Sequence, residues 1–164
     1  MKILEFSRGD SVVVRHRHKG FWGGFLTYFD AIIVKQVGNY GYVIDYYNNE
    51  MGRFITDVVE NTDVRPPPRE IFVSNFDLFD MVDGLDKDGY WKSGTITSTD
   101  PSGSIYYVLL DITKETIGFL FSQLRVHQEW DWDNCKWLPS QSKFVSRIRS
   151  SKQGTKGSSY AFWV

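Results

Sequence analysis

The 164-residue sequence is poor in the residues that covalent cross-links and nucleophilic catalysis require. It has one cysteine, Cys135, and three histidines. A single cysteine excludes an internal disulfide framework, which fits a reducing intracellular compartment. The sequence has no nucleophile elbow, phosphate-binding loop or metal-ligand signature. We therefore expect no enzymatic activity, no cofactor and no bound metal ion.

Long apolar runs are also missing. No stretch approaches the roughly 20 apolar residues that a membrane-spanning helix needs. The N-terminal MKILEFSRGD has no apolar segment of the length found in signal peptides. The sequence thus predicts neither a membrane segment nor a secretion signal.

Charge is nearly balanced overall but uneven along the chain. Nineteen Lys and Arg face 20 Asp and Glu, a formal net charge of −1. Residues 1–70 carry 9 basic and 9 acidic side chains, residues 71–138 carry 5 and 11, and residues 139–164 carry 5 and none. The acidic middle segment suits a cationic partner, whereas the basic end suits weak contact with nucleic acid or simple solvation.

Aromatic residues are abundant, at 16%, and they stand among short apolar runs. SVVV (11–14), AIIV (31–34), YVIDY (42–46) and FITDVV (54–59) are separated by Gly- and Asn-rich segments. This pattern is typical of strands joined by turns. The RPPP segment, 65–68, then interrupts it, because three prolines cannot enter a ladder or a helix interior.

The same order of features then recurs. FSRGDSV (6–12) aligns with FDLFDMV (76–82), GFW (20–22) with GYW (89–91), YVIDY (42–46) with YVLLD (107–111), and VRP (64–66) with LRV (124–126). This predicts two copies of a small β unit, residues 4–68 and 71–138, followed by a basic Ser-rich tail over 139–164 whose composition favours disorder. We expect an all-β fold in which two small, strongly bent barrels pack on each other, since one such unit alone has a marginal core.

The ordered set of motifs resembles a plant tandem Agenet module, which belongs to the Tudor-like group of small barrels. The resemblance covers about residues 4–138. Tyr28 stands where the usual pattern has Trp. The matching residues are Phe6, Gly9, Asp10, Val12, Gly20, Phe21, Ala31, Val34, Tyr42, Tyr46 and Arg65 to Pro68, then Phe76, Asp80, Val82, Asp88 to Trp91, Gly94, Tyr107, Val108, Leu124, Arg125, His127, Trp130 and Trp137.

This resemblance implies a chromatin module in the nucleus, with two units clamped together. Some members of the family bind methylated lysine on the histone H3 tail. The resemblance therefore implies a methylated H3 peptide as the partner, with dimethylated lysine 9 as the expected mark. It also implies a structural role for His127, whose ring is expected to bond a backbone group where the repeats meet.

A methyl-lysine site needs a cage of aromatic rings, because a methylated ammonium keeps its charge and is attracted to ring faces. In Tudor-like barrels these rings come from the first loop and from the turn between the third and fourth strands. The first copy has rings at both places, so we expect the cage there. Phe21, Phe25 and Phe29 are expected to fill the core. The candidate cage residues are Trp22, Tyr28, Tyr46, Tyr47 and Asp45, with Phe21 as a secondary candidate.

Two features refine this cage. Tyr46 and Tyr47 are adjacent, so on a strand they point to opposite faces and at most one of them lines the cage. His16 and His18 alternate near the first loop and share a face. Because histidine titrates near neutral pH, a protonated ring beside the cage would repel the ligand, and binding would strengthen as pH rises.

The second copy has rings at only one of the two places. Tyr90 and Trp91 follow its first loop, but its later turn, LLDITKET, has none. These two rings are secondary candidates. The acidic residues Glu50, Asp86 and Asp88 are candidate contacts for the basic residues of a histone peptide.

Two alternatives to a histone reader stay open. One is a nucleic-acid-binding module whose surface rings stack on bases while the basic tail contacts phosphates. The other is a scaffold for a non-histone protein. The net charge of −6 over residues 71–138 argues against nucleic acid, whereas the net charge of +5 over residues 139–164 argues for it.

Overall fold

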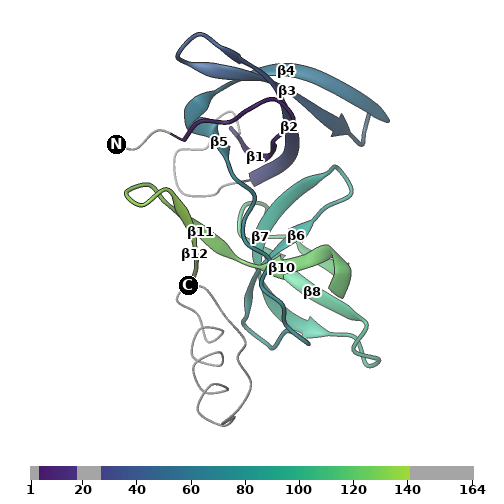
Figure 1. Ribbon diagram of the computed structural model, residues 1–164. Helices are drawn as coiled ribbons and strands as arrows, with labels where there is room; N and C mark the ends of the chain where they lie inside the picture. Colours follow the sequence, from purple (N-terminus) through teal and green to yellow (C-terminus); the bar gives the residue numbers. More distant parts are fainter. Residues whose placement is uncertain (1–3, 18–26, 141–164) are drawn as a thin grey trace.

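The computed structural model describes residues 4–17 and 27–140, whose regular secondary structure is almost entirely β-strand (Figure 1). The first repeat contains β1 (Ser11–His16), β2 (Thr27–Val37), β3 (Gly41–Asn48), β4 (Arg53–Glu60) and β5 (Val64–Arg65). The second contains β6 (Met81–Leu85), β7 (Tyr90–Thr99), β8 (Ile105–Leu110), β9 (Thr116–Leu120) and β10 (Leu124–Val126). Short 3-10 helices, η1 (Asn61–Asp63) and η2 (Phe121–Gln123), precede β5 and β10, and β11 (Gln128–Asp131) and β12 (Lys136–Pro139) follow.

Both repeats have the same topology, which confirms the predicted all-β tandem fold. In the first, the hydrogen-bonded order is β5-β1-β2-β3-β4; in the second, it is β10-β6-β7-β8-β9. All of these neighbours are antiparallel. The long second strand of each repeat carries a register shift, at Ile33/Lys35 in β2 and at Ile96/Ser98 in β7. Such bulges bend the strand, which lets a short sheet curl around its own core.

Each repeat begins with the same hydrogen-bonded turn. The carboxylate of Asp10 accepts a hydrogen bond from the backbone N–H of Ser7 at 2.8 Å. Asp80 accepts the equivalent bond from Asp77 at 2.7 Å. The alignment of 6–12 with 76–82 is therefore confirmed. The pairing of β5 with β1 and of β10 with β6 also confirms the alignment of VRP with LRV.

The alignment of GFW with GYW is wrong. Arg15 lies opposite Tyr28 in the ladder of β1 with β2, and Leu85 lies opposite Trp91 in the ladder of β6 with β7. Trp91 is therefore equivalent to Tyr28 and not to Trp22. The segment between the first two strands is longer in the first copy, and this difference in length misplaced the match.

The alignment of the two YV motifs is wrong by one residue. Ile44 lies opposite Ile33, and Val108 lies opposite the equivalent Ile96. Tyr42 therefore corresponds to Tyr106, and both rings are buried, at 3% and 7% exposure. The second copy has two consecutive tyrosines, so the sequence alone allowed the slip.

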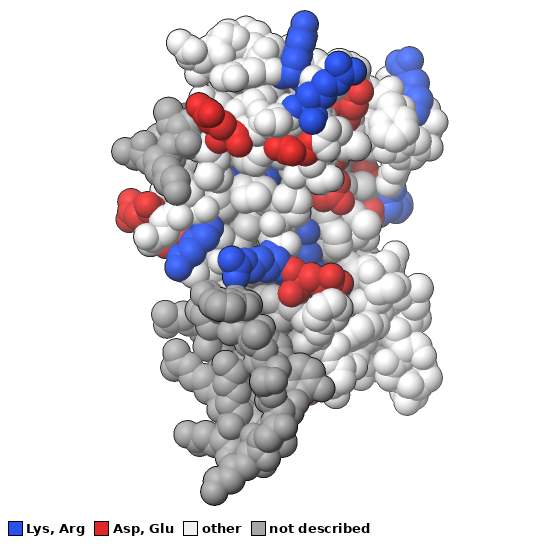
Figure 2. All heavy atoms as spheres, viewed as in Figure 1, with Lys and Arg blue, Asp and Glu red and all other residues white. Residues whose placement is uncertain are grey.

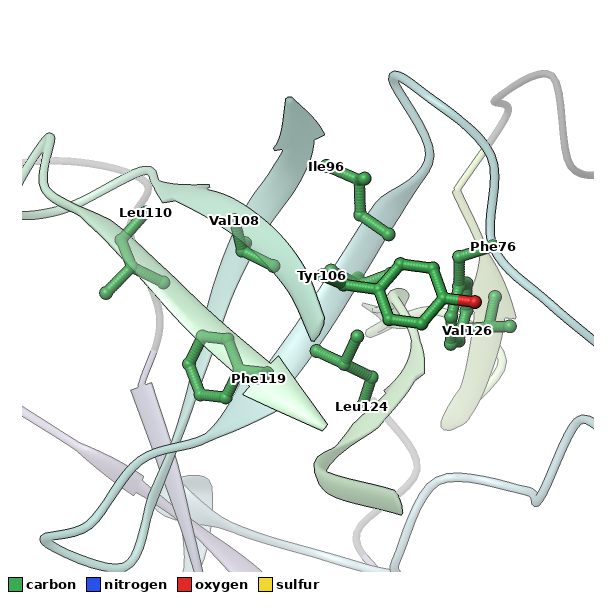
Figure 3. Close-up of a cluster of buried hydrophobic side chains, with 9 residues drawn as sticks. Phe76, Ile96, Tyr106, Val108, Leu110, Phe119, Leu124 and Val126 are labelled. Carbon is green, nitrogen blue, oxygen red and sulfur yellow. The ribbon is translucent and has the colours of Figure 1, made fainter. Parts of the chain in front are cut away.

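Each repeat has its own hydrophobic core on the concave side of its sheet. Alternate residues of the strands supply these cores, as expected for a sheet with one buried face. Figure 3 shows how Phe76, Tyr106 and Phe119 fill the second core among smaller aliphatic side chains. The first core comprises Val12, Val14, Ala31, Ile33, Tyr42, Ile44 and Val64, and the second comprises Phe76, Val82, Ile96, Tyr106, Val108, Leu110, Phe119, Leu124 and Val126.

A three-residue ladder between β2 and β7 joins the two repeats. Tyr28 lies opposite Trp91, with Thr27 opposite Lys92 and Phe29 opposite Tyr90. Because Tyr28 and Trp91 are equivalent positions, this ladder places a local two-fold axis between the repeats. The two sheets thereby become one continuous sheet of ten strands.

An arginine of each repeat lies over the ring at this axis. The guanidinium carbon of Arg65 is 5.3 Å from the centre of the Tyr28 ring, and that of Arg125 is 3.9 Å from the centre of the Trp91 ring. Arg65 is 1% exposed and donates a 2.5 Å hydrogen bond to the Tyr28 hydroxyl. Arg65 and Arg125 are equivalent, so the contact obeys the same local symmetry.

The β11–β12 hairpin lies outside the repeat pattern, and the sequence did not predict it. Figure 1 shows it extending from the second repeat toward the first. The indole N–H of Trp137 donates to the carbonyl of Pro66 at 2.7 Å, and Trp132 lies 4.6 Å from the Arg65 guanidinium. Trp137 also covers Val13, which explains why the SVVV run is buried on both faces of β1.

We expect the substitution Gly94→Ala to destabilise the second repeat. A Cβ at this buried position would lie 2.5 Å from the Leu109 carbonyl oxygen and 2.6 Å from a Val108 methyl group. Overpacking of this kind costs about 1–3 kcal/mol. Urea unfolding measures the loss, with Ser98→Ala, at an exposed position of the same strand, as the control. Equal stability of the two variants would contradict the prediction.

Candidate functional site

Three aromatic rings from three strands meet beside the junction of the repeats. Phe29 on β2 lies 4.8 Å from Tyr46 on β3 and 5.9 Å from Tyr90 on β7, measured between ring centres. The ring of His16, at the end of β1, lies 4.9 Å from that of Tyr90. All four side chains are partly exposed. We call Phe29, Tyr46 and Tyr90 the ring cluster.

The strands position these rings through their register. Phe29 and Tyr90 are directly opposite in the ladder that joins the repeats, so their side chains emerge on the same face. Tyr46 lies on the core face of β3, where it and Phe29 pack against the edge of the first core. The ring cluster therefore combines residues of both repeats, whereas the sequence placed the cage in the first repeat.

Charged groups of both signs act on the ring cluster. Burial raises the pKa of Tyr90, Tyr46, Asp88 and Glu50 raise it further, and the charge of Lys92 opposes them. Burial likewise raises the pKa of Tyr46, and the charge of Asp57 adds to this effect. Both phenols thus stay protonated at neutral pH.

The two adjacent tyrosines of β3 divide as predicted. Tyr46 joins the ring cluster, while Tyr47 points to the opposite face, packs against Phe54 at 5.3 Å and is 50% exposed. Asp45 shares the face of Tyr47, and its carboxylate accepts a hydrogen bond from Thr56. Tyr47 and Asp45 therefore do not line a cage with Tyr46, because neighbouring strand residues alternate in direction.

Tyr28 does not line this cluster either. It is 7% exposed, lies edge-on to Trp137 at 5.3 Å and bonds Arg65 at the local two-fold axis. Trp91, the equivalent residue, lies beneath Arg125 and donates to the Asp30 carboxylate at 3.2 Å. Both rings hold the repeats together, and their adjacent strand positions direct them away from Phe29 and Tyr90.

The predicted acidic contacts differ in their partners. Asp86 and Asp88 both accept hydrogen bonds from the ammonium of Lys92, at 2.5 and 2.9 Å. Burial alone would raise the pKa of Asp86, but the Lys92 hydrogen bond holds it below its usual value. Glu50 is exposed in the turn after β3. The predicted candidates Phe21, Trp22 and His18 lie outside the described residues, as does Phe25, which was expected in the core.

A cavity of about 280 Å³ lies where the second repeat meets the hairpin. Its walls include the aromatic residues Tyr28, Trp130 and Trp137 and the acidic residues Asp83 and Asp111. Asp83 is central: its carboxylate lies 2.6 Å from His127 Nδ1 and accepts a hydrogen bond from Ser93 at 2.8 Å.

This Asp–His–Ser group is not arranged as a hydrolytic triad. Ser93 and Asp83 both lie against the same ring nitrogen of His127, at 3.2 and 2.6 Å, so the imidazole does not relay a proton between them. The predicted backbone partner of the His127 ring is therefore wrong: its Nδ1 lies against the carboxylate of Asp83, within the second repeat. In the ranges 4–17 and 27–140, no cluster of three His, Cys, Asp or Glu could hold a metal ion, and no helix is long and apolar enough to cross a membrane.

Comparison with known proteins identifies the family of this arrangement. Over 139 residues, 82% of the chain, the sequence is 34% identical to the Arabidopsis thaliana protein AGENET DOMAIN (AGD)-CONTAINING P1, of which it spans 26%. No family model matches the chain. The structure is similar to the crystal structure of Arabidopsis thaliana AGDP1 AGD34, with a TM-score of 0.65, 22% identity and coverage of 81% of this chain and 88% of that one. It is also similar to the ADCP1 tandem Agenet domain 3-4, with a TM-score of 0.64, 21% identity and coverage of 81% and 86%.

The chain is a tandem Agenet module. It spans about a quarter of the length of the curated relative it matches. The local two-fold axis relates its two Agenet repeats, and the ring cluster lies to one side of that axis.

The two Agenet repeats differ at the position of the ring cluster. By the ladder register, the equivalents of Phe29, Tyr46 and His16 in the second repeat are Lys92, Leu110 and Asp86. Where the first repeat has a ring, the second has a lysine held by Asp86 and Asp88. Within the described residues the aromatic cluster therefore forms once.

Sequence reasoning missed the role of Phe29 and gave Tyr90 only a secondary place. Phe29 lies on an apolar strand and reads as core, and it does pack partly on the first core. Its second contact, with Tyr90, depends on the ladder between the repeats. No local pattern in the sequence reveals that ladder.

The Asp83–His127 pair makes stability depend on pH from both sides. Burial alone would lower the pKa of His127, but the hydrogen bond and charge of Asp83 raise it. The stabilisation of the fold that protonated His127 provides is complete below about pH 6.5, and it is lost as pH rises through the raised pKa of His127. The pKa of Asp83 is lowered by His127 against the opposing effect of burial, so its contribution is complete above about pH 3.9 and is lost in stronger acid.

We therefore expect His127→Gln to be destabilised by about 1–3 kcal/mol at pH 5–6, the value for a charged hydrogen bond. The difference from the wild type should shrink as pH rises above neutrality. Urea unfolding of the variant and of the wild type at the same series of pH values measures this difference. A difference that stays constant with pH would show that the pair does not titrate as described.

Proposed function

We propose that this tandem Agenet module binds a methylated lysine of the histone H3 tail through the ring cluster. The observation that carries the proposal is the convergence of Phe29, Tyr46 and Tyr90: the ring centre of Phe29 lies 4.8 Å from that of Tyr46 and 5.9 Å from that of Tyr90. Dimethylated lysine 9 is the first mark to test. With this function, the protein would act in the nucleus.

The chemistry of the cluster suits a methylated ammonium. Methylation leaves the charge in place and removes N–H donors, so the cation loses water at little cost and gains attraction to ring faces. Each cation–π contact contributes about 0.5–2 kcal/mol, depending on desolvation. The cluster is partly buried, which places it toward the stronger end of this range.

Carboxylates near the rings support a lower methylation state. A dimethylated ammonium keeps one N–H, which a carboxylate can accept as a charge-assisted hydrogen bond. The charges of Asp88 and, less strongly, Glu50 raise the pKa of Tyr90. Glu50 is exposed in the turn after β3, while Asp88 also pairs with Lys92. Glu50 is therefore the better acceptor.

Nucleic acid remains the competing ligand, and the charge distribution gives it less support. Figure 2 shows acidic and basic side chains interspersed over the described part of one face, without a continuous basic track. Single-stranded nucleic acid requires rings beside such a track, because phosphate contacts supply much of the affinity.

Titration with H3 peptides tests the proposal. We expect the wild type to bind a peptide dimethylated at lysine 9 at least about tenfold more tightly than the unmodified peptide. Tyr46→Ala and Tyr90→Ala should each remove most of this preference, because each deletes one wall of the cluster. Calorimetry or fluorescence anisotropy gives the affinities, and thermal unfolding shows that the variants are folded.

Tyr47→Ala is the matched control, since Tyr47 is the strand neighbour of Tyr46 and points to the opposite face. Its affinity should equal that of the wild type. Equal binding of methylated and unmodified peptides by the wild type would refute the methyl-lysine site. Tighter binding to a single-stranded DNA or RNA control than to either peptide would favour the nucleic-acid function.

A further inference from the structure

Two hairpin turns from different repeats meet beside the ring cluster. The side-chain amide of Asn49, in the turn between β3 and β4, donates a 3.0 Å hydrogen bond to the carbonyl of Lys87, in the turn between β6 and β7. The amide also lies against Gly89, where an added Cβ would come within 3.2 Å of it. Asn49 itself is exposed.

Two of the three rings lie on strands that flank these turns. Tyr46 lies three residues before Asn49 on β3, and Tyr90 directly follows Gly89 as the first residue of β7. The hydrogen bond from Asn49 therefore connects the wall supplied by the first repeat to the wall supplied by the second. The ladder between β2 and β7 fixes Phe29 against Tyr90, but it does not include β3.

Each turn is internally ordered, so the contact joins two stiff elements. In the second repeat, the N–H of Gly89 bonds the carbonyl of Asp86 at 2.9 Å, and the N–H of Asp86 bonds the carbonyl of Tyr90 at 2.9 Å. In the first, the Asn48 side chain accepts the N–H of Met51 at 2.8 Å. A displacement of one turn would therefore move its ring with it.

We propose that Asn49 is a positioning residue for methyl-lysine binding, because it fixes the separation of Tyr46 and Tyr90. This inference rests on the proposed function. Ligand and turn contact then reinforce each other: a cation held between the two rings stabilises the docked turns, and the docked turns raise affinity for the cation by the same factor. The partner is a methylated lysine that touches both repeats at once.

The residue types at the contact fit this role. Asparagine supplies the N–H donor that a backbone carbonyl requires, and an aspartate of the same shape would place a carboxylate against that carbonyl. Position 89 has φ of +87°, and its glycine leaves space for the Asn49 amide. A side chain at position 89 would be strained and would also press against the amide.

The first experiment compares Asn49→Ala with Asn61→Ala. Asn61 makes the same kind of bond, from its amide to the carbonyl of Asn39 at 3.2 Å, but within the first repeat. We expect Asn49→Ala to weaken binding of the dimethylated H3 peptide about threefold to tenfold, the effect of one hydrogen bond, and Asn61→Ala to leave it unchanged. Binding of the unmodified peptide should not change in either variant, and both should remain folded.

A double-mutant cycle separates positioning from a general loss of stability. If Asn49 acts by holding Tyr90, Asn49→Ala should weaken binding in the wild type but have no further effect in a Tyr90→Ala background. Hydrogen exchange gives a second readout: the methylated peptide should slow exchange of the amides at 86–90 in the wild type and much less in Asn49→Ala.

The outcomes distinguish this inference from the function on which it rests. Suppose that Tyr46→Ala loses the preference for the methylated peptide but Asn49→Ala binds it with wild-type affinity. This result would overturn the positioning role of Asn49 and leave the proposed methyl-lysine binding intact. Additive effects of Asn49→Ala and Tyr90→Ala would overturn it too. A wild type without methyl preference would refute both.

Discussion

The three-residue ladder between β2 and β7 is the contact on which the remainder of the structure depends. It places Tyr28 opposite Trp91 on a local two-fold axis and lays an arginine over each ring. A cation over an aromatic face is worth most where water is excluded, and Arg65 is almost fully buried. The ladder also orients Phe29 toward Tyr90, so the interface that joins the repeats is the same one that assembles the ring cluster.

The local symmetry makes the differences between the repeats informative. A cluster near a two-fold axis should occur twice, yet within the described residues it forms once. Lys92 stands where the first repeat has Phe29, and two carboxylates neutralise it there. The second repeat thus contributes a ring to its neighbour's cluster while its own equivalent position holds a salt bridge. Within residues 4–17 and 27–140 the ring cluster therefore has one orientation relative to the local axis, which would suit the proposed peptide ligand.

Much of the fold could be predicted from the sequence, because alternation and turn residues are local signals. The Asp10 and Asp80 turns, the strands and the duplication all follow from short motifs. The site was less predictable, since ring exposure is decided by long-range pairing. The sequence predicts that Tyr28 lines a cage, whereas in the structure its ladder partner Trp91 and Arg65 enclose its ring. The prediction that Tyr46 and Tyr47 point to opposite faces of β3 is correct, because the alternation of side chains along a strand is a local property.

The symmetric ladder also bears on how such a module arises. A contact between equivalent residues is the kind that two identical single-repeat chains make as an isologous dimer. Linking the copies through residues 66–70 replaces an encounter that depends on protein concentration with one set by the length of the linker. Each copy can then change without its partner changing in step. Phe29 and Lys92 occupy equivalent positions but are different residues. A dimer of identical chains cannot have this difference.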